Sequence, residues 1–221
     1  MKLRHEYKHR LSPLELPVLR CRLSAAMKTD PYAKQGFYCI RSLYFDNSAD
    51  KALREKIDGV NKREKFRLRY YNGDVSRIIL EKKSKYGNLC SKVQEAIHWE
   101  EAEKLTFGLI PSSAESSLLE ELGVKMKLQG LRPKTIVDYI REPFVFAPGN
   151  VRVTLDHHLR TAMNPTGFLD PDCSTIPAGE GLAILEVKWD QFLPCVIQEL
   201  VQVPGVQTSS FSKYAACRIY G

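Results

Sequence analysis

Several common sequence signatures are missing from this chain of 221 residues. No two of its six cysteines form a CxxC pair, so a zinc ribbon, a thioredoxin motif or a disulfide scaffold is not indicated. There is no Walker A motif and no GxGxxG, which argues against the usual nucleotide-binding loops. No apolar run reaches about 18 residues, and the first residues lack the apolar core of a signal peptide. We therefore expect no membrane span and a reduced, cytoplasmic setting.

Long blocks of like charge are also missing, which argues against a charged disordered tail. The formal net charge is +7, which favours an anionic partner, and hydrophobic residues make up 43% of the chain, which is enough for a sizeable core. No internal repeat, low-complexity tract or linker divides the sequence. We therefore expect one domain over residues 1–221.

What the chain does contain is a series of short stretches in which charged and apolar residues alternate with period two. The clearest is KFRLRYY at residues 65–71, where cations alternate with apolar or aromatic residues. Such alternation is typical of a β-strand whose two faces lie in different environments. Asn72-Gly73 follows this stretch and is a strong signal for a hairpin turn into the next strand.

The whole pattern predicts an α+β fold built on an eight-stranded antiparallel β-barrel, a tunnel with helices packed outside. Expected strands cover residues 3–11, 38–45, 65–71, 77–83, 89–97, 134–141, 151–156 and 183–188. Expected helices cover residues 12–28, 49–57, 99–107, 113–129, 192–201 and 210–219, and residues 164–181 are expected to form a long loop. We interpret His157 and His158 as polar loop residues, because adjacent side chains on a regular strand point to opposite faces.

The charged strand faces suggest what such a tunnel would bind. Arginine matches phosphate oxygens in pairs, and a divalent metal bound to phosphates prefers carboxylate oxygens. The faces supply Arg4, Glu6, Lys8, Arg41, Lys65, Arg67, Arg69, Glu81, Lys83, Lys92, Arg141, Arg152, Glu186 and Lys188. If these faces converge inside a closed sheet they form a polyanion site, and if they face outward they are an ordinary solvated surface. Carboxylates repel a phosphodiester backbone, so we expect no nucleic-acid partner.

In these same stretches the sequence resembles the VTC domain, a polyphosphate polymerase domain of the CYTH, or triphosphate tunnel metalloenzyme, superfamily. The resemblance covers nearly the whole chain, and the chain is similar to a bacterial-type, stand-alone version of the domain. The matching stretches are RHEYKHRL at 4–11, RSLYFDN at 41–47, KFRLRYY at 65–71, LEKKSKYGN at 80–88, VDYIREPF at 137–144, VRVTLD at 151–156, LEVKW at 185–189 and SFSKY at 210–214.

The resemblance implies roles for individual residues. It implies catalytic phosphate contacts by Lys8, Arg67, Arg69, Lys83, Arg141, Arg152, Lys188 and Lys213, and substrate contacts by Arg4, Arg41, Lys65, Lys92 and Tyr139. Glu186 would hold a divalent metal, Mn²⁺ or Mg²⁺, together with Glu6, which matches the surviving part of the superfamily's first-strand ExExK motif. The first Glu of that motif is replaced by Arg4 in this chain, and VTC domains generally differ from the motif at this position too. The replacement argues against a simple triphosphatase.

The implied reaction joins the γ-phosphate of ATP to a growing polyphosphate and releases ADP. Two departures from the yeast-type domain weaken this transfer: Ser210 and a single Lys213 replace a lysine-rich stretch, and the accompanying membrane and SPX-type segments are not in this sequence. A separate membrane protein is therefore one expected partner. A non-catalytic triphosphate- or polyphosphate-binding module and a hydrolase need the same cations, and both readings stay open.

Overall fold

The computed structural model describes residues 4–87, 89–111, 117–203 and 211–219. Its strands are β1 (His5–Leu11), β2 (Lys28–Thr29), β3 (Tyr38–Asp46), β4 (Lys62–Tyr71), β5 (Ile78–Tyr86), β6 (Leu89–Ile97), β7 (Arg132–Phe146), β8 (Val151–Ala162), β9 (Ile176–Pro177) and β10 (Ala183–Trp189). Its α-helices are α1 (Glu15–Ala26), α2 (Lys51–Ile57), α3 (Trp99–Thr106), α4 (Ser117–Gln129), α5 (Cys195–Leu200) and α6 (Lys213–Arg218), with short 3-10 turns at Pro148–Asn150, Pro165–Leu169 and Gly179–Gly181.

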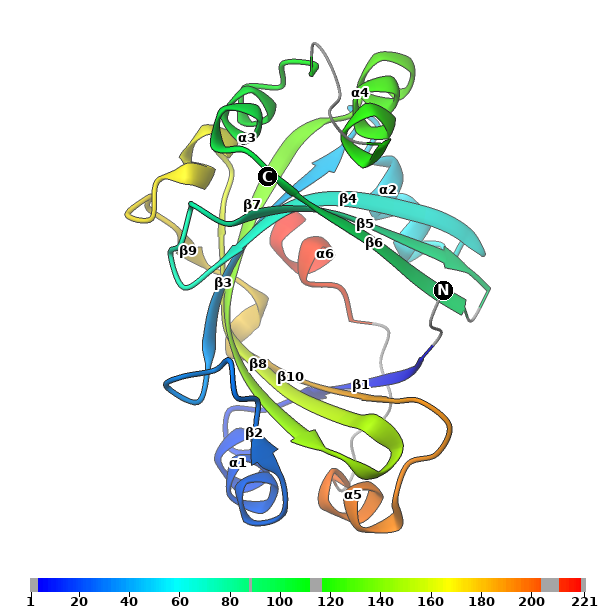
Figure 1. The fold of residues 1–221 in the computed structure, drawn as a ribbon, viewed down its shortest axis with the longest axis vertical. Helices are drawn as coiled ribbons and strands as arrows, with labels where there is room; N and C mark the ends of the chain where they lie inside the picture. Colours follow the sequence, from blue (N-terminus) through cyan, green and yellow to red (C-terminus); the bar gives the residue numbers. More distant parts are fainter. Residues whose placement is uncertain (1–3, 88, 112–116, 204–210, 220–221) are drawn as a thin grey trace.

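A single antiparallel sheet connects most of these elements. Its strand order is β1-β10-β8-β7-β3-β4-β5-β6, with the two-residue strands β2 and β9 added beside β7 and β8. The sheet curls into a half-barrel (Figure 1), and in the described part of the chain its two end strands, β1 and β6, do not pair with each other. The predicted α+β fold with eight antiparallel tunnel strands is confirmed, in a form that is open along one side.

Two strands run well beyond their expected ends. β7 has 15 residues and β8 has 12, because their mutual pairing continues past a bulge between Asp138 and Ile140. His158 has a positive φ of 52° at this bulge. The interpretation of His157 and His158 as loop residues is therefore wrong. Both lie in β8, and the bulge breaks the alternation so that their Nδ1 atoms meet at 2.5 Å.

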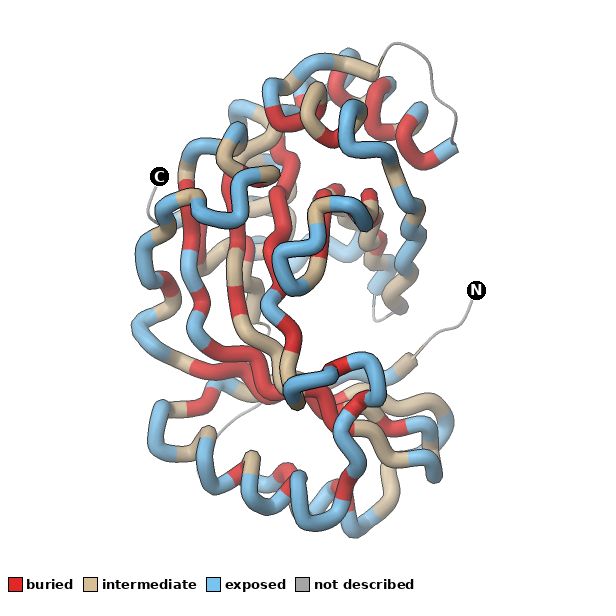
Figure 2. The backbone as a smooth tube through the Cα atoms, turned by 60° about the vertical axis from the view of Figure 1, so that its left-hand side comes forward, coloured by how far each residue is buried: buried red, intermediate tan, exposed pale blue. Residues whose placement is uncertain are grey.

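Helices cover the convex outer face of the sheet at two places (Figure 1). α3 and α4 pack with the outer side chains of β4 and β5 in one apolar cluster, which includes Phe66, Leu68 and Leu80. α1 and α5 pack with β8 and β10 in a second cluster, which includes Leu19 and Val187. Buried residues follow the strands, while the outward surfaces of the helices are exposed (Figure 2). No helix in the described residues is both long and apolar enough to cross a membrane.

The last helix, α6, differs from the expectation that helices pack outside, because it lies on the concave inner face (Figure 1). Tyr214 of α6 stacks on Tyr44 of β3 at a centroid distance of 5.0 Å and donates a hydrogen bond of 2.8 Å to Asp46. Cys217 packs in the same apolar cluster, with Val137 and inner residues of β3, β7 and β8. Ser212 caps this helix by accepting a hydrogen bond from Ala215 N. The helix start predicted at residue 210 lies outside the described residues.

Candidate functional site

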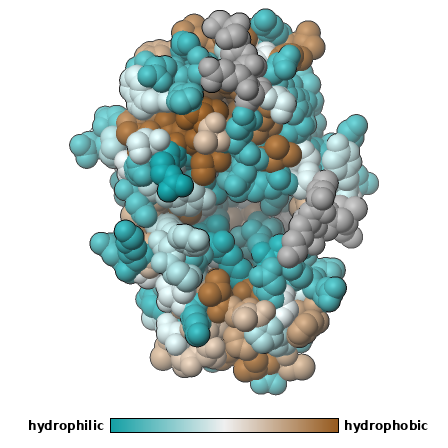
Figure 3. Space-filling view, in the orientation of Figure 1, coloured by the Kyte–Doolittle hydropathy of each residue, from teal (hydrophilic) through white to brown (hydrophobic). Residues whose placement is uncertain are grey.

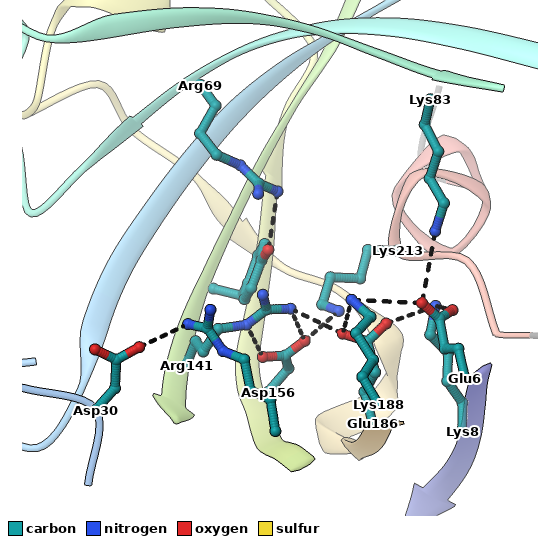
Figure 4. Close-up of polar contacts among 12 residues, drawn as sticks. Glu6, Lys8, Asp30, Arg69, Lys83, Arg141, Asp156, Glu186, Lys188 and Lys213 are labelled. Carbon is teal, nitrogen blue, oxygen red and sulfur yellow. Dashed lines mark hydrogen bonds and ion pairs between the residues drawn. The ribbon is translucent and has the colours of Figure 1, made fainter. Parts of the chain in front are cut away.

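Charged side chains from eight elements converge on the concave face of the sheet, where the space-filling view shows a hydrophilic hollow between the upper and lower parts of the molecule (Figure 3). We call this group the inner cluster. It consists of Glu6, Lys8, Lys65, Arg67, Arg69, Glu81, Lys83, Lys92, Tyr139, Arg141, Asp156, Glu186, Lys188 and Lys213, several of which are drawn in Figure 4. Most of the predicted site residues are thus brought together, from both ends of the chain.

Glu186 lies at the centre of the lower part of the inner cluster (Figure 4). Its side chain is only 7% exposed, and its oxygens lie 3.0 Å from Lys8 Nζ, 3.1 Å from Lys188 Nζ and 3.5 Å from Arg141 Nη2. Burial alone would raise the pKa of Glu186, but the cations of Lys188, Lys8 and Arg141 outweigh it and hold the pKa well below its ordinary value. Glu186 is therefore a carboxylate at neutral pH.

Glu6, on the neighbouring strand β1, shares its cationic partners with Glu186. Glu6 lies 2.8 Å from Lys8, 3.4 Å from Lys188 and 3.7 Å from Lys83, a residue of the opposite wall. Burial and the charge of Glu186 would raise the pKa of Glu6, yet the three lysines together lower it. The two carboxylates are thus ionised and close together.

Asp156 was not predicted as a site residue, although it lies on the same period-two face as Arg152 and Thr154. It is completely buried, and its two oxygens bind Arg141 Nε and Lys213 Nζ, each at 2.6 Å. Burial opposes its ionisation, but Arg141 and Lys213 lower its pKa to about 2. Asp156 thereby ties α6 to the sheet and orients the Arg141 guanidinium. The signal that could have found it was the strand alternation itself.

In the upper part of the inner cluster, Glu81 is the buried carboxylate that pairs with three cations. It is 2% exposed and lies 2.5 Å from both Arg67 Nη2 and Lys92 Nζ, and 3.7 Å from Arg69 Nη1. Burial opposes ionisation of Glu81, but these cations hold its pKa far below the ordinary value. Arg69 also donates a hydrogen bond of 3.0 Å to the hydroxyl of Tyr139 on β7. Arg67, Arg69, Lys92 and Tyr139 therefore all lie on the inner face, and their contacts with phosphate stay a prediction.

Tyr44 is a second residue that the sequence interpretation missed. Its buried hydroxyl accepts a hydrogen bond of 2.8 Å from Arg67, and Lys65 lies 5.2 Å from its ring centre. Burial would raise the pKa of Tyr44, but Arg67, Lys65 and Arg69 lower it to about 7. In turn, burial lowers the pKa of Lys65 to about 8, which the charge of Tyr44 only partly opposes.

The expectation that Arg41 contacts substrate on the inner face is wrong. Arg41 binds Asp138 with an Nη2–Oδ2 distance of 2.8 Å and donates to the carbonyls of Gly167 and Asp170. It pairs in register with Tyr70, whose side chain belongs to the outer apolar cluster. The inner face of β3 therefore carries Tyr44 and its even-numbered neighbours, opposite to the face expected from the sequence.

Two more predicted residues lie away from the centre of the inner cluster. Arg4 precedes β1, and it pairs with Asp190 at 2.7 Å and with the carbonyl of Asn150, so it is held beside the ends of β8 and β10. Arg152 pairs at 3.1 Å with Asp30, which lies at one side of the group drawn in Figure 4. The ion pair with Asp190 therefore holds Arg4 outside the inner cluster.

The donor set for a divalent metal is small. The described residues contain no group of three or more His, Cys, Asp or Glu that could hold a metal ion. Mg²⁺ and similar cations, however, commonly bind one or two carboxylates together with waters and substrate phosphates. Glu6 and Glu186 fit this requirement. The buried hydroxyl of Thr154, a residue that pairs in register with Glu186, has no hydrogen-bond partner among the residues that the structure describes. These residues suit a metal that arrives with a phosphate ligand.

Comparisons with known proteins agree with this architecture. The family model of the VTC domain matches residues 3–219. The crystal structure of a candidate adenylate cyclase from Bacillus halodurans superposes with a TM-score of 0.54 at 14% identity, covering 92% of this chain and 93% of that chain. The PH1012 protein of Pyrococcus horikoshii OT3 gives 0.51 at 12% identity, covering 96% and 98%. No curated protein matches the sequence. The two structures share the fold, and the family match over nearly the full length shows that this chain belongs to the VTC domain family.

Proposed function

We propose that the inner cluster binds ATP, triphosphate or polyphosphate and catalyses metal-dependent transfer of the γ-phosphoryl group of ATP to a polyphosphate chain. The observation that carries this proposal is the excess of cations over carboxylates on an enclosed concave face, with three arginine forks among them. Such forks match phosphate oxygens in pairs, and phosphoryl transfer depends mainly on positioning and charge stabilisation.

The proposed reaction is an in-line displacement. A terminal oxygen of the polyphosphate chain forms a bond to the γ-phosphorus while the bond from that phosphorus to the bridging oxygen of ADP breaks, and ADP leaves with the electron pair. The attacking oxygen is already ionised, so the site needs no general base. Arg67, Arg69 and Arg141 would align the phosphates, and Lys213 would reach them from α6.

Glu6 and Glu186 would hold the divalent cation, Mn²⁺ or Mg²⁺. When bound, the metal supplies charge neutralisation at the phosphate oxygens. Lys8 and Lys188 bind these carboxylates in the ligand-free protein and would turn toward phosphate oxygens as the ligand enters. This arrangement keeps buried charges paired in both states, which limits the cost of burying them.

The decisive experiment incubates the purified protein with ATP and either Mn²⁺ or Mg²⁺ and separates the products on a polyphosphate-staining gel. Long polyphosphate supports the proposal. Release of free phosphate alone identifies a hydrolase, and tight binding of unchanged ATP identifies a non-catalytic binding module. Lys82→Ala is a suitable control, because Lys82 lies on the outer face and pairs with Glu64 at 3.3 Å.

The remaining parts of the proposal concern the setting of the protein. We propose a single domain over residues 1–221, a cytoplasmic location, no nucleic-acid partner and an association with a separate membrane protein. Fractionation of cells tests the location. Co-purification with the tagged protein tests both the membrane-protein partner and the absence of a nucleic-acid partner, independently of activity.

A further inference from the structure

Beyond the inner cluster, the inner face of β4 and β5 continues as a row of cations that have no carboxylates between them. Arg63 pairs in register with Lys85, and Lys65 pairs with Lys83. Arg63 and Lys85 lie two residues beyond the inner residues Lys65 and Lys83, so they share the same face. Like charges directly opposite each other destabilise a sheet. Two successive cation pairs on one face are therefore unfavourable for the fold unless they bind something.

Lys56 of α2 joins this row from the side. Burial lowers the pKa of Lys56, and the nearby cations Arg63, Lys8, Lys85 and Lys83 lower it further. Lys56 therefore lies near the cross-strand pairs of Arg63 with Lys85 and of Lys65 with Lys83, and adds a further cation to them.

The partners of these side chains support the same conclusion. Within the described ranges, neither Lys56 nor Lys85 has a hydrogen bond or an ion pair with a carboxylate, and Arg63 donates only to the carbonyl of Val60, at 2.6 Å. On the outer face of the same two strands, by contrast, Lys82 contacts both Glu64 and Glu121. Carboxylates thus neutralise Lys82 on the outer face and Arg67 on the inner face, whereas in the described part of the chain no carboxylate pairs with Lys56, Arg63 or Lys85.

We propose that Lys56, Arg63 and Lys85, which we call the cation row, bind the phosphates of a linear polyphosphate chain that continues beyond the inner cluster. This inference rests on the proposed function, in which the inner cluster holds the reacting phosphates. Arg63 lies four residues from Arg67 on β4, which corresponds to about 13 Å along a strand. A ligand that contacts both ends must therefore be an extended polyanion. The row follows β4 and β5 toward the open side of the half-barrel (Figure 1), where such a chain can leave.

A nucleic acid strand fits the cation row less well than polyphosphate. Proteins that bind single strands combine a basic groove with aromatic side chains on which bases stack. The inner positions 63, 65, 83 and 85 are all Lys or Arg, and the nearby Tyr86 lies on the alternate face of β5 with Lys62 over its ring. A ligand that consists only of repeated phosphates needs no such platform.

The test compares two ligands and two matched variants. The row variant is Lys56→Ala/Arg63→Ala/Lys85→Ala, and the control variant is Lys28→Ala/Lys34→Ala/Lys127→Ala, which removes the same charge from exposed positions. Affinities for tripolyphosphate and for long-chain polyphosphate are measured over a range of salt concentrations. Relative to the control variant, the row variant should lose about tenfold or more in affinity for the long chain, and the slope of log affinity against log salt should fall by about 2. Its affinity for tripolyphosphate should match that of the control.

The other outcomes are separable. If both ligands weaken equally, or if the control variant loses as much long-chain affinity as the row variant, the cation row is not a binding track. If the wild-type protein binds neither phosphate ligand, the proposed function itself fails. If a single-stranded oligonucleotide binds the wild type more tightly than polyphosphate and the row variant abolishes that binding, the assigned occupant is wrong.

Discussion

The two walls of the inner face balance charge differently. The lower wall, formed by β1, β8 and β10, places Glu6, Asp156 and Glu186 among its cations, so that nearly every charge has a partner at ion-pair distance. The upper wall, formed by β4, β5 and β6, has Glu81 as its central carboxylate and continues into cross-strand cation pairs. The lower wall is thus organised before a ligand arrives, whereas under the proposed function the upper wall would gain its balancing charge from the ligand.

The largest effect is expected from breaking the lower wall at Asp156. In Asp156→Ala the buried cations of Arg141 and Lys213 lose their shared partner, and removal of one member of a buried ion pair costs about 3–5 kcal/mol of unfolding free energy. Urea denaturation measures this loss. The outer, half-buried Glu64, which pairs with Lys82 and Lys125, is the control, and Glu64→Ala should cost about 0–1 kcal/mol. Equal losses in the two variants would contradict the pre-organised lower wall.

Glu186→Gln should separate the metal-binding role of the lower wall from the charge-pairing role of the upper wall. We expect turnover to fall by about 10²–10³-fold, as for the loss of one group that stabilises charge at a reaction centre, while triphosphate binding without metal survives or tightens. Mn²⁺ titration followed by electron paramagnetic resonance measures metal affinity directly. Glu81→Gln in the upper wall is the matched control and should keep its Mn²⁺ affinity. Unchanged Mn²⁺ affinity in Glu186→Gln would falsify the metal assignment.

The upper wall should respond most to the ligand. Triphosphate at about 100 times its dissociation constant should stabilise the wild-type fold by about 2.7 kcal/mol, beyond the effect of chloride at equal ionic strength. Arg67→Ala and Arg69→Ala should each weaken triphosphate binding by about 1.5–3 kcal/mol, the range for hydrogen bonds to charged groups. Calorimetry and melting temperatures measure both effects. Lys82→Ala should change neither, and an equal loss there would refute the assignment of the two faces.

The smallest effect is expected from pH. Tyr44 has a pKa of about 7 in the folded protein against an ordinary value of 10, so the unfolded chain binds more protons between these values, and stability should rise with pH across this window. The pKa of Lys65, about 8 against 10.5, acts in the same direction. A bound polyanion disfavours the Tyr44 phenolate, so triphosphate affinity should fall above pH 7. The fall should be about tenfold if the ligand moves this pKa by one unit.

Tyr44→Phe keeps the stacking on Tyr214 and removes the ionisable hydroxyl. We expect the stability gain with pH and the loss of affinity with pH both to shrink in this variant. The comparison uses guanidinium denaturation and binding measurements at matched ionic strength between about pH 6.5 and 9.5. This window covers most of the interval between the folded pKa of Tyr44, about 7, and its ordinary value of 10. The same pH profile in wild type and variant would show that Tyr44 does not ionise in this range.

Period-two alternation predicted the inner face correctly for seven of the eight expected strands, and β3 is the exception. In β4, alternation placed Arg67 and Arg69 together correctly, because the opposite face is plainly apolar. In β3, Arg41 looked like the ligand, whereas the inner residue is Tyr44, since a cation is as easily paired with Asp138 outside as with phosphate inside. Asp156 was missed although alternation places it on the same face as Arg152, because the expected strand ended at this residue, whereas β8 continues to Ala162.

The sequence was enough to predict the eight long strands in outline, their order along the chain and the residues that share a face in their regular parts, because period-two alternation depends only on neighbours along one strand. The tertiary structure alone decided which carboxylate pairs with which cation, the inward position of α6 and the cations left without partners. Those features depend on the curvature of the sheet, which brings β1 opposite β5 and Lys213 onto Asp156 across 57 residues of chain. Ion pairs between residues so far apart in the sequence depend on how the elements pack and which side chains they bury, and these cannot be predicted from a local sequence pattern.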